Sequence, residues 1–310
     1  MKYIIGDCIE KMDLIENYSI TSIYLDPPFD SGRNYTMSKD DSTGFSDTWK
    51  SDDYKKFITD VIDKCIPKLK QNGTLFFHIS ADRMFIPEQI LRDKFKNVQP
   101  IFWKKCRSKN NVKRKLGATI DIIFKCTNSK SPKFNIVYQS RDEKYVKNSF
   151  NNKDERGQYS LGHLVTENTK KGYMYSFEFN GKIFNPDSGW RIKESELIKL
   201  KQDNRIHPPK MDKSKLYKKI YLHETFGKPC TDLWDDIHSI GQGSELRTYP
   251  TAKPIQLLER IISISSDEGD IILDPMCGSG TTAKACKNLN RESILIDIND
   301  NTDIINNRLL

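Results

Sequence analysis

The sequence predicts an α/β fold in which a mostly parallel, twisted sheet carries helices on both faces. In the first and last thirds of the 310-residue chain, short apolar segments alternate with amphipathic helical patterns. Such alternation is typical of a parallel sheet that is covered by helices. Residues 129–248, in between, are polar and basic, with short apolar segments separated by Gly, Asn and Lys. A loop of this length without a function would be unusual, so we expect an inserted region there.

The first third is expected to supply one half of the sheet. Apolar runs predict the strands, and apolar residues that recur at helical spacing predict the helices. Proline and the Asn72-Gly73 pair separate these elements. In chain order we expect strands over residues 2–5 and 22–25, a helix over 54–69 that ends near Pro67, a strand over 74–79, a helix over 87–95, and two antiparallel strands over 98–103 and 119–125.

The last third resumes the alternation and adds a glycine turn. Gly278 and Gly280 separate an apolar strand from a helix, and this arrangement lets a nucleotide-like ligand approach the backbone. The expected elements are a helix over 254–263, a strand over 271–273, a helix over 281–288 and a strand over 293–296.

Composition limits the class of protein. Hydrophobic residues make up 36% of the chain and charged residues 30%, and the formal net charge is +8. This charge favours an anionic partner such as nucleic acid. We expect no signal peptide and no membrane span, because no apolar run is long enough. Seven cysteines without a CxxC pair are typical of reduced thiols in a cytoplasmic protein and argue against a zinc site.

The segment YLDPPF at residues 24–29 is the most informative feature of the chain. Its prolines cannot extend a central strand or a helix, so they should form a rigid bend that fixes the neighbouring side chains. A carboxylate there could accept hydrogen bonds from an exocyclic amine, and an aromatic ring could stack on a base. We interpret the segment as a site for chemistry on a nucleobase amino group; a proline-capped strand end with a surface acid is the alternative. The expected catalytic residues are Asp26, Pro27, Pro28 and Phe29.

A second motif reads DIILDPMCGSGTTA over residues 270–283. Its Gly278-x-Gly280 pair alone could belong to a site for NAD or a flavin. Asp274 argues otherwise, because an acid just ahead of the glycines would repel a pyrophosphate but attract the ammonium group of S-adenosylmethionine. Asp297, which ends the following strand, is placed to bind ribose hydroxyls. We therefore favour S-adenosylmethionine over NAD as the cofactor.

Together the two motifs resemble those of the DNA amino-methyltransferases, which act on adenine N6 or cytosine N4, in the permuted order called β. In that order the catalytic motif precedes the cofactor-binding motif, and a target-recognition region lies between them. Segments YIIGDC at 3–8 and YPTAKP at 249–254 resemble motifs that lie beside the cofactor. DERGQY at 154–159 and GWR at 189–191 resemble the middle region of type III modification subunits and solitary type II relatives. Two residues depart from the usual motifs of this family. Phe29 stands where Tyr is commoner, and Ala252 stands where Gln usually precedes the lysine.

The resemblance implies the Rossmann-like fold of the S-adenosylmethionine-dependent methyltransferases. Residues 1–128 would form the catalytic half and residues 249–310 the cofactor-binding half of one domain, with target recognition in 129–248. The expected cofactor-binding residues are Asp7, Cys8, Asp26, Lys253, Asp274, Met276, Cys277, Gly278, Gly280, Thr281, Thr282 and Asp297.

The resemblance also implies a reaction, in which a methyl group passes to the N6 amino group of an adenine flipped out of double-stranded DNA. The protein would be the modification component of a restriction-modification system, with a homodimer and a cognate restriction endonuclease as further partners. The initial Asp of the tetrapeptide favours adenine, since relatives that methylate cytosine more often begin with Ser. Alternatives are DNA N4-cytosine or RNA methylation, and a catalytically silent DNA-binding subunit.

A basic segment, KKCRSKNNVKRK at residues 104–115, contains no acid. Beside such a site it favours contacts with the phosphate backbone, with a solvated face as the alternative. Residues 30–50 contain glycines and aromatics and are interpreted as a loop that closes over the base, or else as a plain surface loop. The expected DNA-binding residues are Lys104, Lys105, Arg107, Lys113, Arg114 and Lys115.

Overall fold

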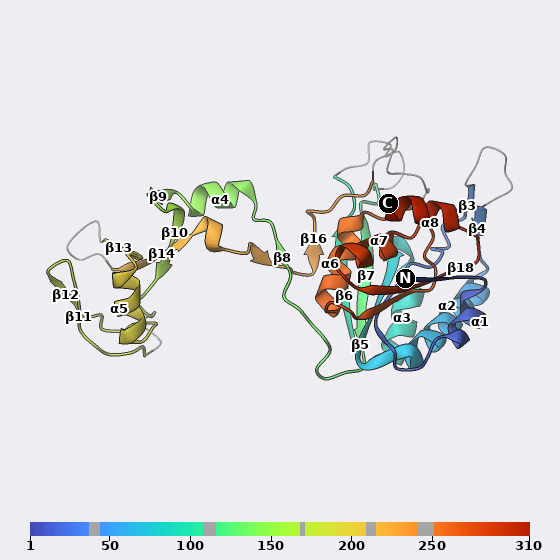
Figure 1. Ribbon diagram of the computed structural model, residues 1–310, viewed down its shortest axis with the longest axis horizontal. Coiled ribbons are helices and arrows are strands. Elements are labelled where there is room, and N and C mark those ends of the chain that lie inside the picture. Colours follow the sequence, from blue (N-terminus) through green and yellow to red (C-terminus); the bar gives the residue numbers. More distant parts are fainter. Residues whose placement is uncertain (37–43, 108–115, 168–170, 209–214, 241–250) are drawn as a thin grey trace. The chain divides into compact units, whose positions relative to one another are not determined.

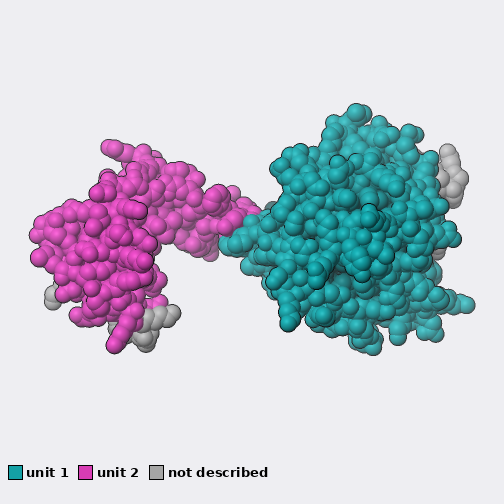
Figure 2. Space-filling view, turned by 60° about the horizontal axis from the view of Figure 1, so that its bottom comes forward, with its two compact units in different colours: residues 1–137, 229–310 teal, residues 138–228 magenta. Residues whose placement is uncertain are grey.

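Among the described residues, eight strands form the central sheet, in the order β1-β18-β17-β2-β5-β7-β6-β16 (Figure 1). The sheet belongs to the first of two units of the computed structural model, which comprises Met1–Val137 and Pro229–Leu310; the second unit is Tyr138–Lys228 (Figure 2). The whole second unit lies within residues 129–248. The structure describes residues 1–36, 44–107, 116–167, 171–208, 215–240 and 251–310.

Most neighbouring strands of the sheet are parallel. Strands β1, β18, β17, β2 and β5 follow one another in parallel, as do β16 and β6, whereas β7 lies antiparallel between β5 and β6. This confirms the predicted sheet and its antiparallel pair. The strands are β1 Lys2–Ile5, β2 Ile20–Leu25, β5 Leu69–Ser80, β6 Asn97–Lys104, β7 Ile120–Thr127, β16 Leu233–Trp234, β17 Ile271–Asp274 and β18 Glu292–Asp297.

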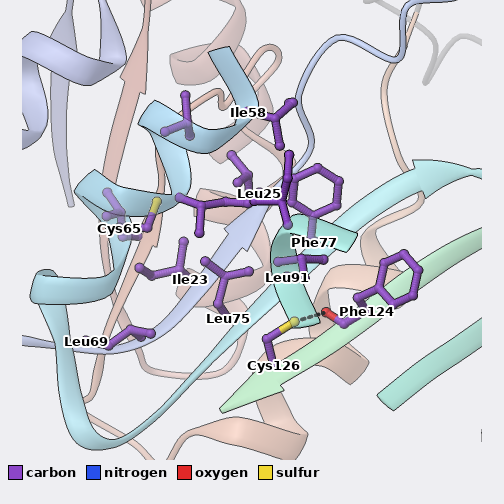
Figure 3. Packing of buried hydrophobic residues seen from close by; sticks show 14 of the residues in the cluster. Ile23, Leu25, Ile58, Cys65, Leu69, Leu75, Phe77, Leu91, Phe124 and Cys126 are labelled. Carbon is purple, nitrogen blue, oxygen red and sulfur yellow. Dashed lines mark hydrogen bonds between the residues drawn. The ribbon is translucent and has the colours of Figure 1, made fainter. Parts of the chain in front are cut away.

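Helices cover both faces of the sheet. Successive residues of a strand point to opposite faces, so one strand can pack against both layers of helices. Ile23 and Leu25 of β2 pack with α2 and α3 on one face (Figure 3), while Tyr24 packs with α6 and α7 on the other. The remaining elements of this unit are α1 Cys8–Lys11, η1 Met12–Leu14, the hairpin β3 Arg33–Thr36 and β4 Gly44–Asp47, α2 Ser51–Cys65, η2 Ile66–Lys68, η3 Ala81–Arg83, α3 Phe85–Lys94, α6 Ile255–Ser265, α7 Thr281–Asn288 and α8 Thr302–Leu309.

The structure differs from the sequence prediction around Pro67. The helix predicted over 54–69 ends earlier, at Cys65, and the short η2 follows it, because proline lacks the N–H that would continue the α-helix. The Asn72-Gly73 pair, predicted to be a turn before the strand, lies inside β5, where the register between β5 and β2 shifts.

The second unit contains the four-stranded sheet β13-β14-β10-β9 and the hairpin β11-β12. Trp190 is buried among its apolar residues, and Gly172 and Gly189 approach each other so closely that a Cβ on either would clash with the other's backbone. No helix in the described part of the chain is both long and apolar enough to span a membrane. The elements from β8 to β15 are β8 Tyr138–Gln139, α4 Glu143–Ser149, β9 Asn152–Asp154, β10 Gly157–His163, β11 Phe177–Phe179, β12 Lys182–Phe184, α5 Glu194–Gln202, β13 Ile206–His207, β14 Tyr217–Tyr221, η4 Leu222–Glu224 and β15 Lys228–Pro229.

Candidate active site

Three acids lie where neighbouring parallel strands end. Asp26 directly follows β2, Asp274 is the last residue of β17, and Asp297 is the last residue of β18. Because carboxyl ends of parallel strands meet at one edge of a sheet, all three line one cavity, whose volume is about 900 Å³. The predicted site residues that line it are Asp7, Cys8, Asp26, Pro27, Pro28, Phe29, Lys105, Lys253, Asp274, Met276, Cys277, Gly278, Thr281, Thr282 and Asp297.

The other predicted site residues do not line this cavity or lie outside the described residues. Gly280 precedes α7 with a φ of 71°, and a Cβ there would lie 2.8 Å from the Ile305 side chain. Lys104 ends β6, and neither it nor Arg107 lines the cavity. The predicted residues that lie outside the described part of the chain are Lys113, Arg114 and Lys115, together with residues 37–43 of the expected closing loop.

The Asp26 carboxylate has one paired and one unpaired oxygen. Its Oδ2 accepts a hydrogen bond from Lys253 Nζ, which also lies 5.4 Å from the centre of the Phe29 ring. Its Oδ1 is buried, and no donor among the described residues hydrogen-bonds to it; His78 Nδ1 lies 3.8 Å away. Lys253, predicted to bind the cofactor, therefore hydrogen-bonds to the carboxylate and lies beside the ring of the proposed catalytic segment.

His78 links Asp26 to a polar chain that the sequence did not reveal. It lies fully buried in β5, with Nδ1 2.7 Å from the Tyr24 hydroxyl and Nε2 3.5 Å from Asp121 Oδ2. Lys105 Nζ donates to Asp121 Oδ1 at 2.7 Å. Burial alone would raise the pKa of Asp121, but His78 and Lys105 outweigh burial and lower it. The one sequence signal was a histidine inside an apolar strand, since a buried polar side chain needs partners.

Asp274 and Asp297 are buried acids that also line the cavity. Burial raises the pKa of Asp274 to about 7, although Thr282 Oγ1 and the Met276 N–H both donate to its carboxylate. Burial also raises the pKa of Asp297, whose Oδ2 accepts the Gly278 N–H at 2.8 Å. Both acids would therefore be stabilised in their ionised form by a positively charged ligand.

Asp7 and Cys8 close the end of the cavity next to β1. The Gly6 N–H donates to the Asp297 carbonyl at 2.8 Å, which ties this turn to β18. Asp7 caps α1 by accepting the Ile9 N–H at 2.8 Å. Among the described residues, no group of three or more His, Cys, Asp and Glu side chains could hold a metal ion.

Comparison with known proteins identifies the family. The family model for DNA methylases that act on N6 and N4 amino groups matches residues 20–305, which include Asp26, Asp274 and Asp297. The chain belongs to the N6/N4 DNA methylase family. Family membership confirms the resemblance read from the two motifs.

Curated relatives of this DNA methylase include a type II methyltransferase, a type III Mod subunit and a DNA adenine methyltransferase. Type II methyltransferase M.EcaI of Enterobacter cloacae is 27% identical over 290 residues, 92% of this chain and 63% of the relative. The Mod subunit of the type III enzyme StyLTI of Salmonella typhimurium is 23% identical and covers 94% of this chain, which spans 50% of that subunit. DNA adenine methyltransferase YhdJ of Escherichia coli is 25% identical over 95% of this chain and 77% of the relative. The chain thus spans about half to two thirds of the length of several relatives.

Solved structures share the fold of this DNA methylase. PvuII DNA methyltransferase, which is cytosine-N4-specific, aligns with a TM-score of 0.56 at 12% identity over 99% of this chain and 86% of its own. TTHA0409 of Thermus thermophilus, solved in complex with S-adenosyl-L-methionine, gives a TM-score of 0.51 at 14% identity over 99% and 92% of the two chains. These likenesses confirm the predicted α/β methyltransferase fold.

The residues of the cavity fit S-adenosylmethionine, the methyl donor of this family. That molecule carries an ammonium group, a sulfonium group and ribose hydroxyls, and it has no phosphate. In the described structure neither Asp274 nor Asp297 forms an ion pair with Lys or Arg, and burial raises the pKa of both. Two acids of this kind suit a cationic ligand, and they would repel a pyrophosphate.

Proposed function

We propose that this DNA methylase transfers a methyl group from S-adenosylmethionine to the N6 amino group of an adenine flipped out of double-stranded DNA. One observation carries the proposal: the Asp26 carboxylate, the Phe29 ring and the buried acids Asp274 and Asp297 all line one cavity. The net charge of +8 supports an anionic polymer as substrate.

Asp26 would stabilise the transition state by accepting hydrogen bonds from the target amino group. Adenine's exocyclic nitrogen is a poor nucleophile because its lone pair is delocalised into the ring. Hydrogen bonds to the Asp26 carboxylate and the Pro27 carbonyl favour a more tetrahedral nitrogen, which gains positive charge as its bond to the methyl carbon forms. The cofactor would supply that methyl group from its positively charged sulfur, and the sulfur–methyl bond would break as the nitrogen–methyl bond forms, which leaves a neutral thioether. The carboxylate can then accept the proton that the methylated nitrogen loses, and Phe29 stacks on the base.

Lys253 pairs with one oxygen of Asp26 and leaves the other, Oδ1, without a donor among the described residues. Its ammonium lies on Asp26 Oδ2 and 5.4 Å from the centre of the Phe29 ring, the two groups that the target base would use. The lysine therefore neutralises the carboxylate before the amino group arrives. We assign Lys253 to the target-base side of the cavity, whereas Asp274, Asp297, Asp7 and the glycine turn would hold the cofactor.

The rest of the chain would select and hold DNA. We assign residues 129–248 to target recognition, and residues 1–128 and 249–310 to the two halves of the catalytic domain. Lys104 and Arg107 would contact phosphates beside the site. The chain would act as the modification component of a restriction-modification system; one relative is the Mod subunit of the restriction-modification enzyme StyLTI.

The test is transfer of radiolabelled methyl from S-adenosylmethionine to unmethylated genomic DNA, followed by chromatography of the nucleosides. We expect label in N6-methyladenosine, since Asp begins the catalytic tetrapeptide. Label in N4-methylcytosine would keep the chemistry and overturn the choice of base. Absence of label in DNA, with S-adenosylmethionine still bound, would contradict the proposal and favour RNA.

A further inference from the structure

The Asp47 carboxylate holds the backbone that directly follows the catalytic tetrapeptide. Asp47 is the last residue of β4 and is 2% exposed. Its Oδ1 accepts the Asp30 N–H at 2.7 Å, and its Oδ2 accepts the Ser31 N–H at 3.0 Å. Its own carbonyl accepts the Gly32 N–H at 2.8 Å. Three successive peptide groups after Phe29 are thus bound to one residue.

The backbone held in this way is strained. Asp30 has a φ of 55°, in the left-handed region that non-glycine residues seldom occupy. Its carboxylate in turn accepts the Trp49 N–H at 3.1 Å and pairs with Arg83 at 3.1 Å. The turn after Phe29 and the end of β4 therefore hold each other through reciprocal carboxylate bonds, and these bonds keep the sharp reversal in place.

Tyr54 fixes the other side of Phe29. Its hydroxyl donates to the Pro28 carbonyl at 3.0 Å, and its side chain is buried in α2. Burial, with the charges of Asp47 and Asp30 nearby, raises the pKa of Tyr54 and keeps it a neutral donor. The Pro28 carbonyl is thereby held by Tyr54. The aromatic ring at position 29 lies between two anchored peptide groups.

We propose that Asp47 is the positioning residue of the catalytic segment, which fixes Phe29 for stacking on the target base. This role rests on the proposed function and deepens it, because stacking needs a ring that is oriented before the base arrives. A carboxylate suits the task because it offers two acceptor oxygens to two N–H groups, whereas an amide offers one acceptor and would turn an N–H donor toward the other. Asp47→Asn therefore breaks one of the two bonds with little change in volume.

The experiment compares the wild type with Asp47→Asn and a matched control, Asp270→Asn. Asp270 likewise holds a backbone N–H, that of Asp267, at 2.8 Å, but it is only partly buried and precedes β17, at the opposite end from the site. Hydrogen exchange of the peptides spanning residues 28–32, S-adenosylmethionine affinity, and kcat and KM for methyl transfer to DNA are measured on all three proteins.

For Asp47→Asn we expect faster exchange over residues 28–32 and a kcat that falls roughly 10-fold or more, with cofactor affinity within about twofold of the wild type. For Asp270→Asn we expect a lower melting temperature without either change. Unchanged exchange over 28–32 in Asp47→Asn would overturn the proposal whatever the activity. So would faster exchange with an unaltered kcat. A wild type that transfers no methyl to DNA would refute the proposed function, and the exchange data would still decide whether Asp47 anchors this turn.

Discussion

Two acids at the cavity of the first unit and two acids of the second unit of this DNA methylase lie in opposite electrostatic environments. In the first unit, Asp274 and Asp297 are buried at strand ends without a cationic partner among the described residues, and burial raises the pKa of both. In the second unit, Asp154 and Asp203 lie beside Lys or Arg, and these partners lower the pKa of both. Buried acids without partners cost folding free energy, so they persist mainly where function needs them. The difference separates two acids that suit a cationic ligand, Asp274 and Asp297, from two that already have cationic partners, Asp154 and Asp203.

Charges of the second unit neutralise one another around Tyr221. Lys219 donates to Asp154 at 2.8 Å and, with Tyr221, lowers the pKa of that acid to about 2. Arg205 pairs with Glu224, and its guanidinium lies 5.4 Å from the centre of the Tyr221 ring. A polar surface of this kind stabilises a small unit modestly and needs no ligand.

The largest effect is expected at Asp26, the proposed catalytic residue of the first unit. Asp26→Ala should lower the rate of methyl transfer roughly 100-fold or more, because the target amino group loses its acceptor in the transition state. Affinity for S-adenosylmethionine, measured by calorimetry, should change little. Near-normal turnover would refute the catalytic assignment.

Asp274→Asn should change function and stability in opposite directions. Cofactor affinity should fall roughly 10- to 100-fold, because the ammonium group loses its anionic partner. The free energy of unfolding should rise by on the order of 1 to 4 kcal/mol at pH 8. An acid with a pKa near 7 when folded binds more protons in the folded state. Wild-type stability therefore falls as pH rises from about 4 to 7, and the asparagine variant escapes this loss.

Asp270→Asn is the matched control for this pair of measurements, because Asp270 lies four residues away at the other end of β17. Burial would raise its pKa, but the Asp267 N–H and Lys133 outweigh burial and lower it to about 2. Its replacement should reduce stability at neutral pH and leave cofactor affinity unchanged. If both variants behaved alike, the distinction between partnered and unpartnered acids would fail.

Neutralising Lys104 and Arg107 should weaken DNA binding roughly 10-fold, equally for all sequences. The slope of log affinity against log salt should become shallower by about 2, one for each lost phosphate contact. Lys105 provides a contrast, since it is paired with Asp121 at the cavity; Lys105→Ala should leave the salt slope nearly unchanged. Filter binding at several salt concentrations measures all the variants, and an unaltered slope in the double variant would make the basic segment a solvated face.

The smallest effect is expected in the second unit. Arg205→Met removes the partner of Glu224 and should lower the melting temperature by roughly 1 to 4 °C, less at high salt. Cofactor affinity should not change. A loss of cofactor binding in this variant would show that the unit's surface charges serve more than local stability.

Local patterns in the sequence predicted the frame of the molecule well. Strand β1 and helix α7 lie at the residues predicted, because apolar periodicity and the glycine turn define them locally. The bond between Lys253 and Asp26 joins residues 227 positions apart, and only the folded sheet brings them together. His78 likewise contacts Asp26 and Asp121, which lie on or beside other strands that are distant in sequence. The partners of Asp47 are closer, 17 and 16 positions away, but no motif marks that turn in the sequence.

Proton release on cofactor binding tests most directly whether Asp274 binds the positively charged ammonium group of S-adenosylmethionine. Calorimetry of S-adenosylmethionine binding at pH 6, in two buffers that differ in ionisation enthalpy, measures that release. Because the pKa of Asp274 is about 7 in the free protein and should fall beside the ammonium group, we expect close to one proton to be released per cofactor at pH 6. Release should become small toward pH 8, because Asp274, with a pKa of about 7, is then already ionised in the free protein. The α-amino group of the cofactor, with an ordinary pKa of about 7.7–8.0, also begins to lose its own proton there. In Asp274→Asn, release should be absent. Binding without proton release at pH 6 would contradict the assignment of Asp274 to the ammonium group of the cofactor.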